Sequence, residues 1–348
     1  MPRIIDLHLH PRENLDDDRM LDTTIPAFRG WYEYVVPMPN SIEPIREFSQ
    51  VRARKGELVR AGLVDDPDGL LMTFQLTRDV KPIDIGGLCE FRHIAGKVYP
   101  AGMTTNSQWG IEDYFDPQFL QNLAAMETLE IPALFHCEKP GANPRTSEVE
   151  FLAILEEIIA RFPNLTIVFE HVSTREGIEF VRRHHRLRHK IFATLTLHHA
   201  TSIWIEAYNH DGSVRNPYLV VKPCLQSPDD RDAVFEAMIS GEPCFGFGSD
   251  SAPHPTRKKE GPNPPSGIFT PPQVAYGKLA EIFASTSEGD WALRMYRFAS
   301  LYATCSRGLS SPTRDIRLVR QDWTVPSNYN GIVPFMADKR LHWLPELI

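Results

Sequence analysis

The chain has 348 residues, a length that suits one large α/β barrel or two ordinary domains. Its 42% hydrophobic and 24% charged residues can build a sizeable core, and no apolar run approaches the roughly 18 to 20 residues that span a bilayer, so we expect a globular protein with no membrane partner. The formal net charge of −8 argues against a broad cationic surface for nucleic acid.

The first residues and the cysteines both indicate a cytoplasmic location. The apolar residues 3–9 run straight into polar residues, without the apolar core and small-residue cleavage site of a signal peptide. The cysteines are scattered and lack CxxC spacing, which argues against a disulfide framework and against a thiolate zinc site. They are Cys89, Cys137, Cys224, Cys244 and Cys305.

Short, continuously apolar segments recur along the chain, which is typical of parallel strands covered on both faces. The predicted strands are residues 3–9, 34–38, 70–76, 96–100, 131–137, 165–172, 191–197 and 243–250. Segments between several of them have apolar residues at helical spacing or Pro and Asp at their starts. The predicted helices are 148–162, 175–184, 228–241 and 271–285. This alternation predicts an α/β fold of the (β/α)8 TIM-barrel type.

No linker, internal repeat or low-complexity tract divides the chain, so we expect a single barrel domain over residues 1–348. The Pro-rich residues 254–267 lie between the last predicted strand and a helix, which predicts an ordered loop. The basic run 182–190 is interpreted as a solvated helix end. Its histidines are expected on the surface: His184, His185 and His189.

Polar residues fall at the strand ends, where a TIM barrel collects its catalytic groups. One histidine in such a place is usually structural, but five at consecutive strand ends are hard to explain by packing. These polar residues are His8, His10, Asn40, Lys97, His136, His171, Asp250 and His254.

His8 and His10 lie two residues apart on a strand, so their imidazoles project from the same face. Such a pair alone also arises by chance. Together with His136, His171 and Asp250 it predicts a metal site, and these nitrogen and carboxylate ligands favour zinc over manganese, cobalt or iron.

Lys97 is surrounded by apolar residues, where an unpaired ammonium is costly. Two interpretations are open. The lysine pairs with an acid such as Glu170 or Asp250, or its neutral amine adds carbon dioxide and the carbamate bridges two metal ions.

These segments resemble the single-function dihydroorotases of the bacterial and fungal type, within the amidohydrolase superfamily. The matching segments, in the family's order and spacing, are 8–12 (HLHPR), 38–40 (MPN), 97–101 (KVYPA), 104–107 (TTNS), 135–136 (FH), 169–171 (FEH) and 249–254 (SDSAPH).

The resemblance implies two zinc ions per chain, bridged by N6-carboxylysine at Lys97. One ion would also bind His8, His10 and Asp250, and the other His136 and His171. The residues implied in substrate binding are Arg12, Asn40, Thr104, Thr105, His254 and Ser266.

The implied reaction is the reversible interconversion of N-carbamoyl-L-aspartate and (S)-dihydroorotate in de novo pyrimidine (UMP) biosynthesis. Asp250 would be the catalytic proton shuttle, first a general base and then a general acid. The family also implies a homodimer.

Two residues depart from the family's pattern. Pro11 precedes Arg12 and could change its aim, and Lys222 falls where we expect a residue that contacts the ring through its backbone. Two alternatives therefore stay open: a related cyclic amidase, such as a hydantoinase or allantoinase, and a catalytically silent homologue that serves as a binding partner.

Overall fold

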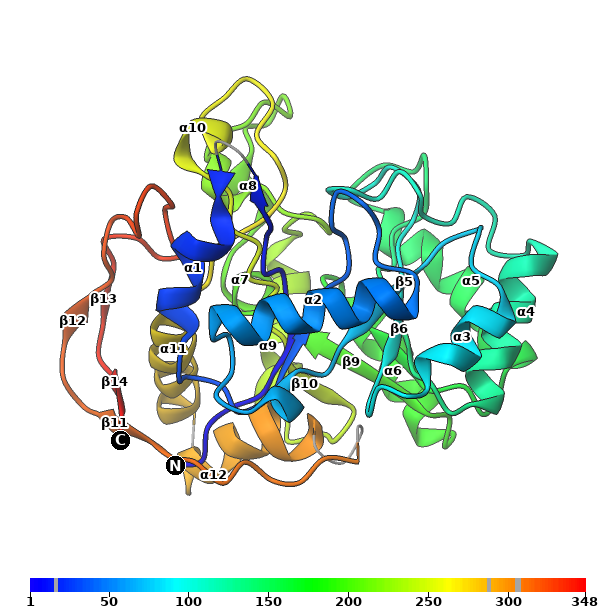
Figure 1. Ribbon diagram of the computed structural model, residues 1–348. Coiled ribbons are helices and arrows are strands. Elements are labelled where there is room, and N and C mark those ends of the chain that lie inside the picture. Colours follow the sequence, from blue (N-terminus) through cyan, green and yellow to red (C-terminus); the bar gives the residue numbers. More distant parts are fainter. Residues whose placement is uncertain (16–17, 287–288, 304–307) are drawn as a thin grey trace.

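A computed structural model describes residues 1–15, 18–286, 289–303 and 308–348 (Figure 1). Within these ranges, parallel strands at all eight predicted places form the central sheet. They are β1 (Asp6–Leu9), β4 (Val35–Pro37), β5 (Thr73–Leu76), β6 (Ala95–Val98), β7 (Ala133–Phe135), β8 (Ile167–Phe169), β9 (Ile191–Leu195) and β10 (Phe245–Phe247). Strands β5 to β10 pair in sequence order, and β1 pairs with β4.

Two joins close this sheet into a barrel. Val35 of β4 forms a parallel bridge with Leu70, just before β5. Leu9 of β1 forms a parallel bridge with Ser251, just after β10, and the His10 amide donates a 2.9 Å hydrogen bond to the Ser251 carbonyl. The predicted (β/α)8 TIM barrel is therefore confirmed.

Helices lie outside the strands (Figure 1). The predicted helices correspond to α5 (Ser147–Arg161), α6 (Arg175–Arg186), α9 (Pro228–Ile239) and α11 (Pro272–Ser285). The others are α1 (Met20–Phe28), α2 (Phe48–Ala61), α3 (Pro82–Leu88), α4 (Pro117–Thr128), α7 (Leu197–Thr201), α8 (Trp204–Ala207), α10 (Thr256–Lys259) and α12 (Trp291–Tyr296). Short 3₁₀ turns lie at Pro67–Gly69 and Pro217–Leu219, and a π-helical turn at Arg297–Leu301.

Burial explains why the barrel strands read as continuous apolar runs. Every residue of β1, β5 and β6 is buried, as the covering of both faces requires.

Local sequence signals determine where the helices begin. At α9, for example, Ser227 and Asp230 form a capping box around Pro228 at the first helical position.

Small antiparallel pairs complete the fold. They are β2 (Asn14–Leu15) with β3 (Asp18–Arg19), β11 (Ile316–Val319) with β14 (Leu344–Leu347), and β12 (Trp323–Thr324) with β13 (Arg340–Leu341). The Pro-rich residues 254–267 are an ordered loop that carries α10.

The basic run ends α6 as expected, but the placement of His184 on the surface is wrong. The residue is 2% exposed, and its ring packs on Phe180 with ring centroids 4.3 Å apart. Its Nε2 lies 3.1 Å from Glu156 Oε2 and its Nδ1 lies 3.0 Å from His189. The helical position of His184 faces the core, which a count of basic residues does not reveal.

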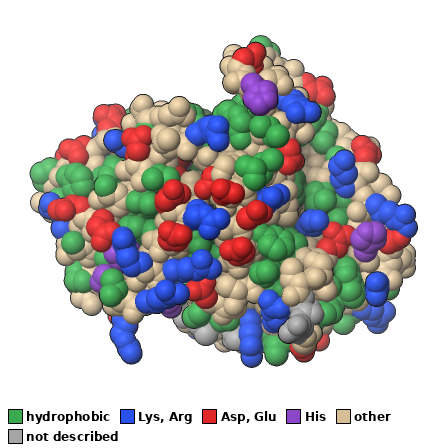
Figure 2. All heavy atoms as spheres, turned by 180° about the vertical axis from the view of Figure 1, so that it is seen from behind, with side chains coloured by type: hydrophobic (Ala, Val, Ile, Leu, Met, Phe, Trp, Pro, Cys, Tyr) green, Lys and Arg blue, Asp and Glu red, His purple; other side chains and the backbone are tan. Residues whose placement is uncertain are grey.

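The face of the molecule seen in Figure 2 mixes acidic and basic side chains and shows no large patch of one sign. Among the residues that the structure describes, no helix combines the length and the apolar composition needed to cross a bilayer.

Glu148 at the start of α5 joins this helix to the segment after β8. Its buried carboxylate accepts hydrogen bonds from the amides and hydroxyls of Ser173 and Thr174. We predict that Glu148→Ala lowers the free energy of unfolding by at least about 3 kcal/mol, because buried donors lose their acceptor. Urea unfolding measures this change.

The control is Glu150→Ala, two residues along the same helix. Glu150 binds Lys139 and Thr146 at the exposed surface, so we expect a change below about 1 kcal/mol. Equal effects of the two substitutions would contradict the importance of the buried junction.

Candidate metal centre

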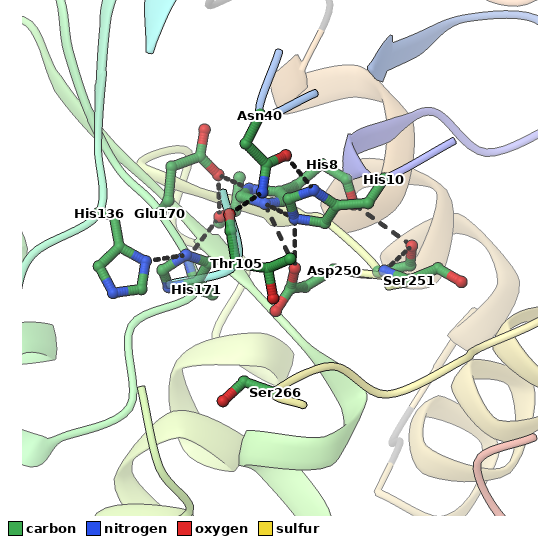
Figure 3. A network of polar contacts seen from close by, with 12 residues as sticks. His8, His10, Asn40, Thr105, His136, Glu170, His171, Asp250, Ser251 and Ser266 are labelled. Atoms are coloured by element: carbon green, nitrogen blue, oxygen red, sulfur yellow. Dashed lines mark hydrogen bonds and ion pairs between the residues drawn. The ribbon is translucent and has the colours of Figure 1, made fainter. Parts of the chain in front are cut away.

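The first group of candidate ligands comes from opposite ends of the sequence. His8 Nε2, His10 Nε2 and Asp250 Oδ1 lie within 4.8 Å of one another. The two imidazole nitrogens are 3.2 Å apart, and each is 3.1 to 3.3 Å from the carboxylate oxygen (Figure 3). The join between β1 and β10 brings them together.

The second group comes from neighbouring strands. His136 follows β7 and His171 follows β8, and the distance from His136 Nδ1 to His171 Nε2 is 3.1 Å. The rings of His8 and His171 have centroids 5.0 Å apart, so the two groups adjoin. The structure thus brings together five of the six predicted ligands as two adjacent sets.

Buried acceptors around these imidazoles fix their tautomers. His8 Nδ1 donates to Glu170 at 2.5 Å, His10 Nδ1 donates to Asn40 Oδ1 at 2.8 Å, and His136 Nε2 donates to Glu138 at 2.7 Å. In each ring the other nitrogen then presents a lone pair to the centre. Facing lone pairs this close repel unless a cation lies between them, so the donor set fits metal ions.

Burial also favours the neutral form of three of these rings. It lowers the pKa of His8, His10 and His171, the last two well below the usual value. Burial raises the pKa of Glu170, but the hydrogen bonds that its carboxylate accepts from His8 Nδ1 and Thr194 Oγ1 lower the pKa and favour the ionised form. Neutral imidazoles are the form that binds metal.

Two candidate ligands have strained backbones. His171 and Asp250 lie just past strand ends with φ of 42° and 45°, in the left-handed region that favours glycine. Such conformations persist where the surroundings enforce them, and they concentrate at functional sites. The His171 amide donates to Thr194 Oγ1 at 2.7 Å, which helps to hold this turn.

Lys97, the sixth predicted ligand, lies on β6 and is fully buried. Its Nζ makes no hydrogen bond within the described ranges and lies over the Tyr99 ring, 5.1 Å from the ring centroid. A direct pair with Glu170 or Asp250 is therefore absent from the described part of the chain. Burial lowers the pKa of Lys97, which favours its neutral amine.

The predicted substrate residues line two adjoining cavities, and the inner one also contains the candidate metal ligands. The inner cavity is bounded by His8, His10, Arg12, Asn40, Tyr99, Thr104, Thr105, His136, His171, Val221, Lys222, Asp250, Ala252, Ser266 and Gly267. An adjoining cavity of about 160 Å³ shares Arg12, Asn40 and Thr105 with it and adds His254. Arg12 lies 3.4 Å from His254 Nε2, so Pro11 has not turned the guanidinium away from the site.

The Thr104–Thr105 loop lies against Asn40. Asn40 Nδ2 donates to the Thr105 carbonyl at 3.0 Å, and Asn106 Nδ2 donates to the Asn40 carbonyl at 3.1 Å. Thr104 Oγ1 is buried and lacks a hydrogen-bond partner in the described part of the chain, so its hydroxyl is available for a ligand.

Glu138 and Tyr99 belong to the site but were not predicted. Glu138 stands two residues after His136, so alternation along an extended chain could have indicated it. Lys222 contributes more than backbone here, because its Nζ lies 3.7 Å from Glu138 Oε1. The sequence could not predict this contact, because Lys222 and Glu138 lie in loops that are far apart in the sequence.

Comparison with known proteins gives consistent results. A family model described as amidohydrolase matches residues 46–215. The dihydroorotase of Hahella chejuensis is 33% identical, over 99% of this chain and 97% of the relative. The Saccharomyces cerevisiae dihydroorotase, solved in complex with 5-fluoroorotic acid, is 27% identical with a TM-score of 0.88, covering 99% of this chain and 97% of that one.

A D-hydantoinase from Thermus sp. shares the fold alone. It is 16% identical with a TM-score of 0.75, and the match covers 99% of this chain and 82% of that one.

The Glu170 contact predicts a measurable effect on metal binding. Glu170→Gln should weaken binding of the metal ion held by His8 by roughly 10- to 100-fold, because the ring loses the anion that orients it. Competition with a chelator measures this. The exposed Glu112→Gln is the control and should leave affinity unchanged. Unchanged affinity in Glu170→Gln would contradict this role.

Proposed function

The chain belongs to the dihydroorotase family and is a hydrolase of cyclic amides, and we propose that it interconverts N-carbamoyl-L-aspartate and (S)-dihydroorotate with two zinc ions at the barrel mouth. The observation that carries the proposal is the buried Lys97 amine, which has no hydrogen-bond partner in the described part of the chain and lies beside a cluster of imidazoles. The proposed reaction is the ring-closing step of de novo UMP synthesis.

Lys97 is proposed to act as a carbamate. Its neutral amine attacks carbon dioxide, an N–C bond forms, and one proton leaves, which gives N6-carboxylysine. The product replaces a costly buried cation with an anion whose two oxygens bind cations. The proposed ligands are then His8, His10 and Asp250 at one ion, His136 and His171 at the other, and Lys97 at both.

When bound, such ions would acidify water and polarise an amide carbonyl. Asp250 has the place for proton transfer, since it reaches into the cavity between His8 and His10. In the direction of ring opening we propose that it accepts a proton from the attacking water and gives it to the departing ring nitrogen.

Arg12, Asn40 and His254 are proposed to bind the substrate's free carboxylate. Burial and the charge of Arg12 lower the pKa of His254 well below its usual value, and the one N–H of the neutral ring can be donated either to the Ser266 carbonyl or to a bound carboxylate. Thr104, Thr105 and Ser266 would close the remaining walls of the cavity. An anion grip of this kind suits a ring that carries a carboxylate.

Two alternatives are less well supported. A hydantoinase or allantoinase would not need Arg12, Asn40 and His254 as a binding site for a carboxylate on the ring. The hydantoinase compared above is similar to this chain in fold alone. A silent homologue would not need both ligand sets, whose members lie 3.1 to 3.3 Å apart.

We also propose that residues 1–348 form one domain, and that the protein is a cytoplasmic homodimer. Cysteines Cys89, Cys137, Cys224 and Cys244 are free, which suits a reducing compartment. The homodimer rests on the family resemblance, and light scattering at twice the chain mass of 39.6 kDa would support it.

Lys97→Ala tests the proposed carbamate. We expect about two zinc ions per chain in the wild type and loss of both turnover and bound zinc in the variant. Metal analysis and ultraviolet absorbance during dihydroorotate ring opening measure these quantities. Zinc-free protein reloaded without bicarbonate should recover less turnover than protein reloaded with it.

The control for this experiment is Lys190→Ala, which removes an exposed lysine. Two zinc ions with no turnover of dihydroorotate in the wild type would move the assignment to another cyclic amide. Full turnover in Lys97→Ala would refute the carbamate.

Arg12→Met tests the carboxylate grip. We expect the KM for dihydroorotate to rise by roughly 30-fold or more, because a buried carboxylate loses its cationic partner. The metal content should stay at the wild-type value. Arg188→Met removes an exposed guanidinium and serves as the control. A KM within twofold of wild type would exclude Arg12 from substrate binding.

A further inference from the structure

Lys259 is a buried lysine that the proposed reaction does not use. Lys259 is the last residue of α10 and is 3% exposed. Its Nζ donates to the carbonyls of Val220 at 3.2 Å, Pro265 at 2.9 Å and Gly267 at 2.8 Å. Three N–H groups thus meet three carbonyl oxygens.

No carboxylate compensates this ammonium within the ranges that the structure describes. Burial lowers the pKa of Lys259 to about 7. A lysine used only for packing would keep its head in water, as long cationic side chains usually do. The backbone carbonyls therefore bind the Lys259 ammonium much as they would bind a small cation.

The three carbonyls belong to two separate walls of the proposed active site. The first wall is formed by Val221 and Lys222, which follow Val220 and line the inner cavity. The second wall is formed by Ser266 and Gly267 of the Pro-rich loop, which also line this cavity. The walls also touch directly, since the Gly267 amide donates to the Val220 carbonyl at 3.0 Å.

The Pro-rich loop in turn positions a substrate residue. His254 Nε2 donates to the Ser266 carbonyl at 3.0 Å. Gly267 has a φ of 147°, and a Cβ there would lie 2.4 Å from the Ala252 carbonyl oxygen, so the loop approaches the segment after β10 as closely as a glycine allows. A shift of the loop would therefore move the acceptor of His254.

We propose that Lys259 is a positioning residue, whose ammonium joins the Val220–Lys222 and Pro265–Gly267 walls and so holds His254 and the adjacent backbone in the geometry that binds the substrate's carboxylate end. This inference rests on the proposed function of the site. It assigns Lys259 to substrate affinity and not to the chemical step.

The proposal predicts a pH dependence with a defined sign. Only the ammonium supplies three N–H donors, so deprotonation leaves one carbonyl unmatched and loosens the walls as pH rises through about 7. The titratable groups nearby are His254, whose pKa the charge of Lys259 helps to lower, Lys222, which pairs with Glu138, and Glu260, which accepts from Tyr218.

The test compares wild type with Lys259→Met, which keeps the apolar stem and removes the donors. Calorimetry measures the Kd of 5-fluoroorotic acid from pH 6 to 8.5. At pH 6 we expect the variant to bind roughly 10- to 100-fold more weakly, with kcat changed much less than KM. The ratio of the two Kd values should fall as pH rises, and titration of the ligand cancels in this ratio.

Two controls bracket this result. Lys190→Met should match wild type, and Lys259→Arg, which stays charged, should lose the pH dependence. Equal Kd values for wild type and Lys259→Met at pH 6 would overturn the proposal, and so would a Kd ratio that is constant with pH.

Hydrogen exchange at the Gly267 amide gives a readout that needs neither ligand nor variant. We expect its protection factor in wild type to fall between pH 6 and 8.5, and constant protection would overturn the proposal even if Lys259→Met does not fold. Failure of wild type to open dihydroorotate or to bind the analogue would instead refute the proposed function, and the exchange result would still decide the role of Lys259.

Discussion

Burial of the Lys97 amine is the constraint on which the site depends. An amine in the barrel without a hydrogen-bond partner in the described ranges cannot remain a cation without cost. The surroundings push it toward its neutral form, and neutral imidazoles converge next to it. Each group is unfavourable in isolation. Together they form a donor set whose lone pairs and anionic oxygens a cation would satisfy, so the proposed metal ions would complete the electrostatic balance of this part of the fold.

A second layer of buried acids makes this arrangement specific. Glu170 and Glu138 orient His8 and His136 and decide which ring nitrogen faces the centre. Glu138 also forms an ion pair with Lys222, which comes from a loop distant in the sequence. The carboxylate that orients His136 thus also contacts this lysine. The candidate ligand His136 is therefore linked to Lys222 in the wall of the cavity through the Glu138 carboxylate.

The sequence predicted what depends on local periodicity and missed what depends on a distant partner. All eight strands were found, because strands covered on both faces leave continuous apolar runs. The spacing of His8 and His10 was informative, since alternation puts them on one face. The burial of His184 and of Lys259 was not predictable, because a basic residue in a polar stretch looks solvated until the rings or carbonyls that surround it are known.

Closure of the barrel between β1 and β10 determines when the candidate ligands can meet during synthesis of the chain. His10 and Asp250 are 240 residues apart, so a ribosome adding roughly 5 to 20 residues per second needs about 12 to 50 s between them. His136 and His171 are separated by only 35 residues and can meet earlier. During synthesis the first histidine pair therefore waits for Asp250, which follows the last strand of the barrel. A complete metal centre is a product of finished folding, and an incomplete chain can hold at most part of it.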